Sequence, residues 1–511
     1  MAFTTLDLSP FVLLVALAAT YGVYIAAVVV QRLYFSPLAK FPGPKIAAAT
    51  GWYEFYYQFI RDGQYIFKIE EMHKKYGPIV RVTPEELSIH DPEFYNELYV
   101  TESRRKTEHY DNFGRGIGLD DSHLFTRDHD LHRIRRKPLE PFFSRLGVTR
   151  LQNMLGEVAL HLETRLREFS GTGKVIRLDH ALTAYTGDII SRIVLDTPDK
   201  SALFLSDPDF SVDWSEVMLG IIKSIPLFMA FPWMISIMSI VPENFMLWAY
   251  PKGQAFKRLQ LRARDQIRKA LKATKEDNQD VTSLFHQVAK SDMPASEKSE
   301  DRLVMEAALL LSGGTFTSSR TIGTAAYYIL AEPDLRQRLQ EELRAPMSAW
   351  PDKTPTLAEL EALPLLQGVV KDTLRTSYGV MHRLPRISPT MPLQYREHTI
   401  PPGIPVGMSA YFMHNDASVY PEPDKFKPDR WIGKIDPAMD RNFVPFARGS
   451  RNCIGHNLAM AQVSLALAVL FRPNGPPMQL YETDETDVKL IHDYAVALPK
   501  LDTKGIRVTV L

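Results

Sequence analysis

The feature that most limits the possible folds is an uncharged, apolar run near the N-terminus, from Phe11 to Val30. A helix of about 20 residues is about 30 Å long, which matches the hydrocarbon core of a bilayer. Asp7 is the only charged side chain before the run, whereas Arg32, Lys40 and Lys45 follow it. Because positive residues stay on the cytoplasmic side, the run predicts a membrane anchor with the rest of the chain in the cytosol.

A cleaved signal peptide is the alternative, but it would carry basic residues before the run and a small-residue cleavage site after it. Here the basic residues come afterwards, and Leu33-Tyr34-Phe35 is a poor cleavage site. We therefore expect a lumenal N-terminus (residues 1–10), a transmembrane anchor (11–30), a proline-rich, non-helical hinge (31–50) and one large body (51–511).

Charge and cysteine content exclude several classes of protein. Acidic and basic residues balance at 60 each, which argues against a nucleic-acid partner. The single cysteine, Cys453, rules out an intrachain disulfide, so the body needs no oxidising compartment. A lone cysteine is usually a small buried hydrophobe, and only its context can change that interpretation.

Periodicity along the body predicts a mainly helical fold with small β-sheets. Residues 77–92 carry short β-branched runs broken by glycine and proline, which indicates a hairpin. From about residue 128 to 345 apolar residues recur every three or four positions, with a charged, solvated connector over 265–302. A second apolar stretch, 217–241, contains a lysine and two prolines, so it is either core or a surface loop that dips into the membrane.

The context of the cysteine is the segment FARGSRNCIG, after which a helical pattern begins. Gly449 and Gly455 allow unusual dihedrals and let the backbone approach a flat macrocycle. Cys453 lies near the start of the helix, where free N–H groups and the dipole favour the thiolate. Arg451 can pair with a carboxylate, and Phe446 would shield the sulfur from water.

This segment matches FxxGxRxCxG, the haem-ligand signature of the cytochromes P-450, at every fixed position, and the chain is identified by this resemblance as a member of that superfamily. The resemblance implies the cytochrome P-450 fold after one transmembrane helix. It also implies haem b (iron protoporphyrin IX) with Cys453 as axial iron ligand, and a monooxygenase in the endoplasmic reticulum membrane. Electrons would come from NADPH through a partner reductase, and the thiolate would favour cleavage of O₂.

Further motifs of the family occur in the expected order. His132 and Arg136 match WxxxR with His in place of Trp, and Arg386 is the second arginine of RLPR; all three would contact the haem propionates. For Arg136, a solvated basic helix face is the alternative. Asp372 and Arg375 stand in place of the family's ExxR.

Their spacing of three puts the acid and Arg375 on one helix face, to form a buried pair with Arg430 of PDKFKPDRW. Because Asp372 is shorter than the usual glutamate, we expect a strained or water-bridged pair.

The segment SGGTFTS resembles the family's oxygen-binding [AG]GxxT. Two adjacent glycines cost about 1 kcal/mol each inside a helix, which predicts an opening at Gly314. Thr317 would hold dioxygen and water, but Phe316 stands where the family has the acid that relays protons. Phenylalanine cannot carry a proton. Protons therefore arrive through water and Thr317, or the substrate supplies a hydroxyl, or the reaction is not plain hydroxylation.

The C-terminal run LYETDETDVKLIHDYAVALPKLDTKG and the segment HDLHRIRRKPLEPFFS resemble fungal enzymes of secondary metabolism, such as the trichothecene-pathway oxygenases. That resemblance implies an apolar terpenoid or polyketide that is hydroxylated, epoxidised or oxidised successively. By family analogy the pocket walls are residues 109–124, 205–245, 380–385 and 494–498, with Phe316 narrowing the pocket. The alternatives are a haem-thiolate isomerase or dehydratase without a reductase, and a non-catalytic haem or ligand-binding protein.

Overall fold

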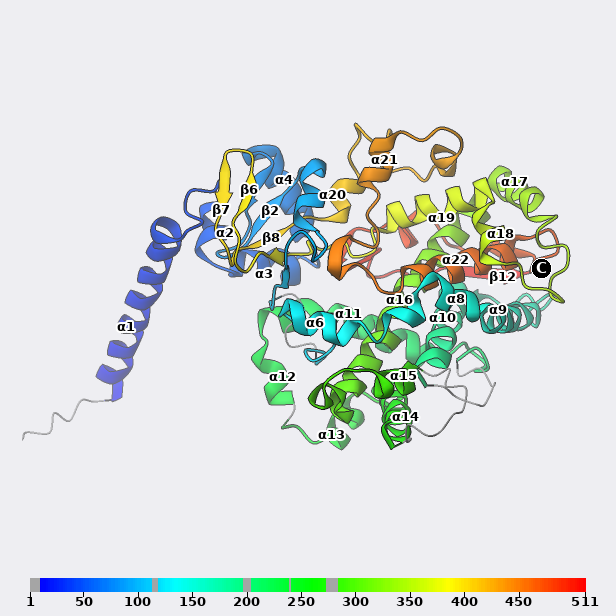
Figure 1. The fold of residues 1–511 in the computed structure, drawn as a ribbon, viewed down its shortest axis with the longest axis horizontal. Helices are drawn as coiled ribbons and strands as arrows, with labels where there is room; N and C mark the ends of the chain where they lie inside the picture. The colour runs from blue at the N-terminus through cyan, green and yellow to red at the C-terminus, as the bar shows by residue number, and fades with distance from the viewer. Residues whose placement is uncertain (1–9, 113–117, 196–203, 239, 273–283) are drawn as a thin grey trace, which may run out of the picture.

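The computed structural model describes residues 10–112, 118–195, 204–238, 240–272 and 284–511. It is mainly helical with small sheets, as predicted (Figure 1). The segment expected to be lumenal lies, apart from Pro10, outside the described residues.

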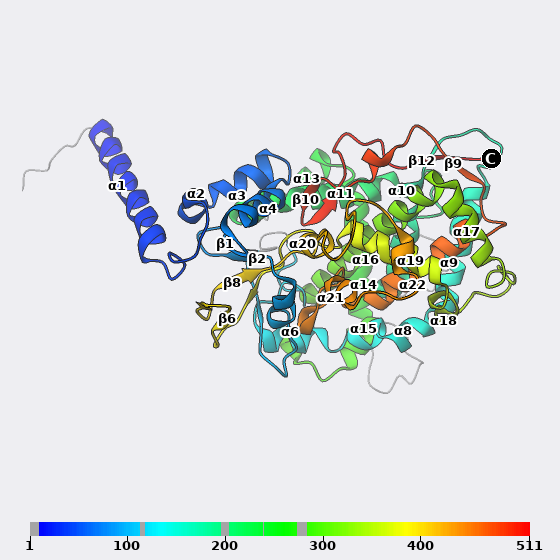
Figure 2. The ribbon, with the colours of Figure 1, turned by 90° about the horizontal axis from the view of Figure 1, so that it is seen from above.

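The N-terminal apolar run forms helix α1 (Pro10–Val30), which continues as a π-helical turn over Gln31–Phe35. An 18-residue window of this helix has a mean hydropathy of 2.3 and none of that window is buried, so the helix is long and apolar enough to cross a membrane. Figures 1 and 2 show it projecting alone from the body.

The expectation of a non-helical hinge after the anchor is wrong in part. The π-helical turn carries helical backbone to Phe35, and a short helix α2 (Lys45–Ala49) follows. Between them Leu38 and Phe41 are buried against strands of the body, so this segment is held in place by apolar packing rather than by proline stiffness alone.

Helices make up most of the body. They are α3 (Trp52–Phe55), α4 (Tyr65–Tyr76), α5 (Tyr95–Leu98), α6 (His129–Arg136), α7 (Glu140–Phe143), α8 (Arg145–Arg150), α9 (Gln152–Arg167), α10 (Leu178–Leu195), α11 (Val212–Ala230), α12 (Trp233–Met238), α13 (Glu243–Ala249), α14 (Gly253–Lys272), α15 (Leu284–Lys290), α16 (Glu300–Ala331), α17 (Pro333–Leu343), α18 (Leu357–Glu361), α19 (Pro364–Ser377), α20 (Ala410–His414), α21 (Pro437–Asn442) and α22 (His456–Phe471).

Four small sheets complete the body. The largest has the strand order β1 (Ile79–Arg81), β2 (Leu87–Ile89), β8 (Pro405–Gly407), β5 (Arg386–Ile387), β3 (Glu108–His109). The others are β4 (Ile176–Arg177) with β12 (Arg507–Val510) and β9 (Met478–Leu480), the pair β10 (His492–Tyr494) and β11 (Val496–Leu498), and the pair β6 (Leu393–Tyr395) and β7 (His398–Ile400). Strands β1 and β2 are the antiparallel hairpin predicted over 77–92.

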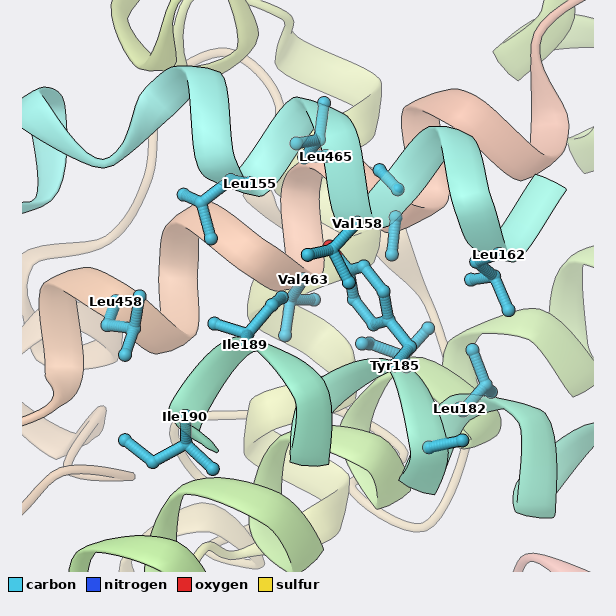
Figure 3. Packing of buried hydrophobic residues seen from close by; sticks show 14 of the residues in the cluster. Leu155, Val158, Leu162, Leu182, Tyr185, Ile189, Ile190, Leu458, Val463 and Leu465 are labelled. Atoms are coloured by element: carbon cyan, nitrogen blue, oxygen red, sulfur yellow. The ribbon is translucent and has the colours of Figure 1, made fainter. Parts of the chain in front are cut away.

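The main core lies where α9, α10 and α22 pack together beside α16 (Figure 3). Leucine, valine and isoleucine side chains from three helices interdigitate there, and the residues labelled in the figure are Leu155, Val158, Leu162, Leu182, Tyr185, Ile189, Ile190, Leu458, Val463 and Leu465. This packing fixes α16 against α10, which positions the residues of the candidate site.

Two sequence expectations about connecting segments need correction. The predicted solvated connector over 265–302 contains the end of α14 and all of α15, and it buries Ile267, Leu284 and Phe285, because each helix turns an apolar side towards the core. For the apolar stretch 217–241, the core interpretation applies to one part and the surface interpretation to another. Its first part, in α11, is partly core, whereas α12 exposes Trp233.

Candidate active site

The loop that carries Cys453 is fixed by backbone contacts on both sides. The N–H of Cys453 donates to the carbonyl of Phe446 at 2.9 Å, and the N–H of Ser450 donates to the carbonyl of Val100 at 3.1 Å. Gly449 has a φ of +76°, and a Cβ there would lie 2.4 Å from the Val100 oxygen. Only glycine fits this turn, as the sequence motif predicts.

The electrostatics at the sulfur differ from the sequence expectation. Helix α22 begins at His456, so the Cys453 thiol receives one N–H, that of Gly455, instead of the full helix terminus. Burial raises the pKa of Cys453, and the Gly455 N–H and Arg136 lower it by less. The side chain nevertheless keeps accessible surface, and a Cβ on Gly455 would meet nothing within 4 Å. A thiol of this kind is deprotonated when it binds a metal, and the open space beside Gly455 fits a flat group.

Two arginines and one histidine gather near this loop. Arg386, Arg451 and His132 are all buried. Burial, together with the nearby Arg386, lowers the pKa of Arg451 to about 9, and burial and Arg451 lower the pKa of His132. Among the described residues neither Arg386 nor Arg451 forms an ion pair with a carboxylate. Adjacent buried cations without an anion fit a dianionic ligand such as the two propionates of haem.

These cations are also tied to the surrounding backbone. Arg451 donates to the carbonyls of Thr107, Thr126 and Arg127 at 3.2, 2.7 and 2.7 Å, and Arg386 donates to that of Pro385 at 3.0 Å. The imidazole Nδ1 of His132 is buried without a hydrogen-bond partner. The two arginines are therefore held in position before any ligand is considered, and the unsatisfied nitrogen of His132 is free to bind one.

Arg136 is not part of a solvated helix face, so that alternative is wrong. It is buried and donates to the carbonyl and side-chain oxygens of Asn452 at 2.6 and 2.8 Å, while its Nε donates to Glu140 at 3.0 Å. Since Asn452 precedes the cysteine, Arg136 braces the cysteine loop directly.

Helix α16 carries the oxygen-binding segment and runs without a break over Glu300–Ala331, so the predicted opening at the two glycines is wrong. Gly314 is required for packing instead, because a Cβ there would lie 2.8 Å from the Ile190 side chain of α10. The hydroxyl of Thr317 donates to the carbonyl of Gly313 at 2.8 Å. Phe316 belongs to the main core cluster, which does not match the expectation that it narrows the pocket.

Asp372, Arg375 and Arg430 come together as the motif spacing predicts. Asp372 contacts the Nε of Arg375 at 2.8 Å and the Nε of Arg430 at 3.0 Å, so the shorter acid needs no water bridge. Two further donors complete the cluster, the indole N–H of Trp431 at 2.9 Å and the backbone N–H of Lys427 at 2.5 Å. The sequence motif PDKFKPDRW contains both residues but did not reveal their role.

Two of the predicted wall segments contact each other. The N–H of Met381 donates to the carbonyl of Ala495 at 3.1 Å, and Nδ1 of His382 lies 2.9 Å from Asp493. A cavity of about 160 Å³ adjoins them; its lining includes Arg32, Glu54, Tyr110, His382 and Arg383. Of the other predicted walls, residues 113–117 lie outside the described part of the chain. The sequence analysis missed the His382–Asp493 contact because its partners are far apart in the chain.

Comparison with known proteins agrees with this geometry. The cytochrome P450 family pattern matches residues 47–473. The cytochrome P450 monooxygenase oblB of Emericella variicolor is 48% identical over 505 residues, which cover 96% of this chain and 92% of that protein. The fusicoccadiene C-8 hydroxylase of Phomopsis amygdali is 45% identical over 490 residues (94% and 93%). The stellatic acid synthase of Emericella variicolor is 42% identical over 518 residues (97% and 94%).

The matched region contains the cysteine loop, the Asp372 cluster and α16, and the similarity extends over nearly the whole chain. Monooxygenases of this kind bind haem and take electrons from NADPH through a reductase. The chain therefore belongs to the cytochrome P450 family and is a haem-dependent monooxygenase.

Proposed function

We propose that the enzyme hydroxylates an apolar terpenoid intermediate of fungal secondary metabolism. Relatives that are 45% identical are named for hydroxylating fusicoccadiene at C-8, and a relative at 42% identity is named as an acid synthase. These names support a hydrocarbon skeleton as the substrate class and support oxidation at carbon as the reaction. Epoxidation and successive oxidation are the alternative reactions that the same chemistry allows, and a polyketide is the alternative substrate class.

The observation that carries the proposal is the cysteine loop, which offers one accessible sulfur near two buried arginines, Arg386 and Arg451, that pair with no carboxylate of the described residues. In the proposal the thiolate of Cys453 would hold the haem iron, and the chemistry that haem would supply there is the activation of O₂ for oxidation of a C–H bond. Arg386, Arg451 and His132 hold the propionates by charge-assisted hydrogen bonds. Phe446 covers the sulfur and excludes water from it.

Cys453→Ser in the full-length protein tests the assignment, with Ser450→Ala in the same loop as the control. We expect the variant to lose the red-shifted Soret band of the reduced carbon monoxide complex and all NADPH-dependent product, whereas the control keeps both. Retention of both by Cys453→Ser would refute thiolate ligation. Product formed by the unchanged enzyme without NADPH and O₂ would instead favour the isomerase or dehydratase alternative.

Proton supply in this proposal uses Thr317 and water, because Phe316 carries no proton. Thr317 is a half-buried hydroxyl on α16, and its hydrogen bond to Gly313 keeps its oxygen close to the helix. The hydroxyl can give up that bond and hold water at its oxygen instead. Exchange of Thr317 for alanine should then uncouple NADPH consumption from product, with hydrogen peroxide as the readout.

We propose that the protein is a single-pass protein of the endoplasmic reticulum membrane with its catalytic domain in the cytosol. The apolar helix α1 supports an anchor. A second apolar surface lies on α12, α13 and the connection between them, where Trp233, Trp248 and Ile240 are 58%, 75% and 81% exposed, respectively. The ring centroids of Trp52 and Phe231 are 6.0 Å apart, and this contact joins the second apolar surface to the segment after the anchor. Lipid contact would cover it, and protease protection in microsomes would report the orientation.

A further inference from the structure

Arg320, in the middle of α16, has no hydrogen-bond acceptor or ion-pair partner among the described residues. Its guanidinium lies over the ring of Phe316, with Cζ 5.5 Å from the ring centroid. Burial lowers its pKa to about 10, and the one charge that opposes this effect is Asp179. Asp179 is already held by two hydrogen bonds from Arg177, at 2.8 and 2.6 Å. The Arg320 guanidinium therefore stays charged at neutral pH, and among the described residues no carboxylate pairs with it directly.

The pattern of burial along α16 shows which helix face carries Arg320. Between residues 306 and 327 of α16 every residue is buried except Ser312, Gly313, Gly314, Thr317 and Arg320. Gly313, Thr317 and Arg320 follow at intervals of four and three, which places them on one helix face. A Cβ on Gly313 would meet nothing within 4 Å, so this face borders open space inside the protein. Arg320 shares that face with the residues of the oxygen-binding segment.

The chemistry of the exposed group favours an anion. An acid at position 316 would lie four residues before Arg320 and would form an ion pair with it. Phe316 removes that partner and offers only its ring face, which leaves the five N–H donors of the guanidinium without an oxygen. A carboxylate satisfies this fork in a bidentate manner and neutralises its charge, whereas a hydroxyl satisfies one donor and leaves the charge.

We propose that Arg320 is a specificity-determining residue that binds the carboxylate of a terpenoid acid beside Thr317. The inference rests on the proposed function and deepens it, because it names the oxidation state of the preferred ligand. The ligand is a terpenoid on which an earlier reaction, the oxidation of a methyl or hydroxymethyl group, has already produced an acid.

The test compares two probes with one carbon skeleton, geranylgeranoic acid and geranylgeraniol, on the full-length holoenzyme in detergent. Dissociation constants are measured by equilibrium dialysis and by the spin-state shift of the Soret band. We expect the unchanged enzyme to bind the acid about tenfold more tightly than the alcohol, as a charge-assisted bidentate pair allows. Arg320→Gln should abolish this preference, and Arg320→Lys should keep part of it.

Two further variants separate the proposal from trivial effects. Phe316→Glu should also abolish the preference, because the new acid pairs with Arg320 across one helical turn. Arg268→Gln, on the exposed side of α14, removes a cation that pairs with Glu300 and should leave the preference unchanged.

An acid preference that survives in Arg320→Gln, or that is absent from the unchanged enzyme, would overturn the proposal. Because dialysis needs no turnover, failure of the monooxygenase assignment would appear separately, as absence of NADPH-dependent product.

Discussion

Two arginines on neighbouring helices of the core, Arg375 and Arg320, have opposite surroundings. Arg375 of α19 is completely buried, as is Asp372, which accepts from its Nε at 2.8 Å. Its other donors reach backbone carbonyls, at 2.5 Å for Pro423 and 2.9 Å for Lys425. Arg320 of α16 lies over the ring of Phe316, and in the described part of the chain no carboxylate forms an ion pair with it.

The contrast distinguishes an arginine whose charge stabilises the fold from an arginine whose charge is available to bind a ligand. Removal of a fully paired buried ion leaves its partners unpaired in the protein interior, which is strongly destabilising. Removal of a buried ion that has no partner leaves nothing unpaired. The same substitution, arginine to glutamine, can therefore be made at both positions, and the difference in unfolding free energy measures the contrast.

The largest effect is expected for Arg375→Gln. It leaves the buried carboxylate of Asp372 without its main cation, which typically costs about 3–5 kcal/mol. Urea unfolding of the full-length protein in detergent, followed by far-ultraviolet circular dichroism, measures the loss. Asp429→Asn, on an exposed pair with Arg338, is the control and should change little. A loss of unfolding free energy below about 1 kcal/mol for Arg375→Gln would contradict the structural role of Arg375 in this comparison.

The Arg375 region should also make stability depend on pH through His414. Its Nδ1 donates to the carbonyl of Arg375 at 2.9 Å and its Nε2 accepts from the N–H of Val444 at 3.0 Å, so the ring is neutral. Burial, and then Arg375, lowers the pKa of His414 from 6.5 to about 3. The folded pKa lies below the unfolded one, so the stabilising contribution is complete above pH 6.5 and is lost as the pH falls towards 3.

Urea unfolding at several pH values tests this dependence. Each pH unit below the unfolded pKa should cost about 1.4 kcal/mol, or roughly 3 kcal/mol in total by about pH 4. His414→Gln cannot titrate, so its unfolding free energy should fall less steeply over this range. Equal slopes for the two proteins would show that protonation of His414 does not weaken the Arg375 region.

The sequence predicted the structural arginine well because its contacts follow from local spacing. Asp372 and Arg375 are three residues apart on one helix, and Arg430 belongs to a recognisable segment. The donors from Lys427 and Trp431 were not predicted, since they depend on how a distant loop folds over α19. Local motifs thus identified the pair, and only the tertiary structure showed that all its hydrogen bonds are made.

Predictions for α16 were less successful for a related reason. The cost of adjacent glycines suggested an opening in the helix, but the close approach of Ile190 makes Gly314 necessary in an unbroken helix. The absence of an acid at Phe316 was visible in the sequence. The consequence for Arg320, four residues later, could not be predicted, because it depends on whether a segment distant in sequence places a carboxylate beside Arg320, and among the described residues none forms an ion pair with it.

The smallest effect on stability is expected for Arg320→Gln. The variant loses the contact with the ring of Phe316, typically worth about 0.5–1 kcal/mol, but it also removes the cost of keeping an unpaired cation away from water. The two contributions oppose each other, so the unfolding free energy should change by no more than about 1 kcal/mol in either direction. The same urea experiment without added ligand measures it. A loss as large as that of Arg375→Gln would mean that Arg320 has a structural role. A cation that stabilises the ligand-free protein so strongly must already have a partner. The proposal that Arg320 binds a ligand would then be wrong.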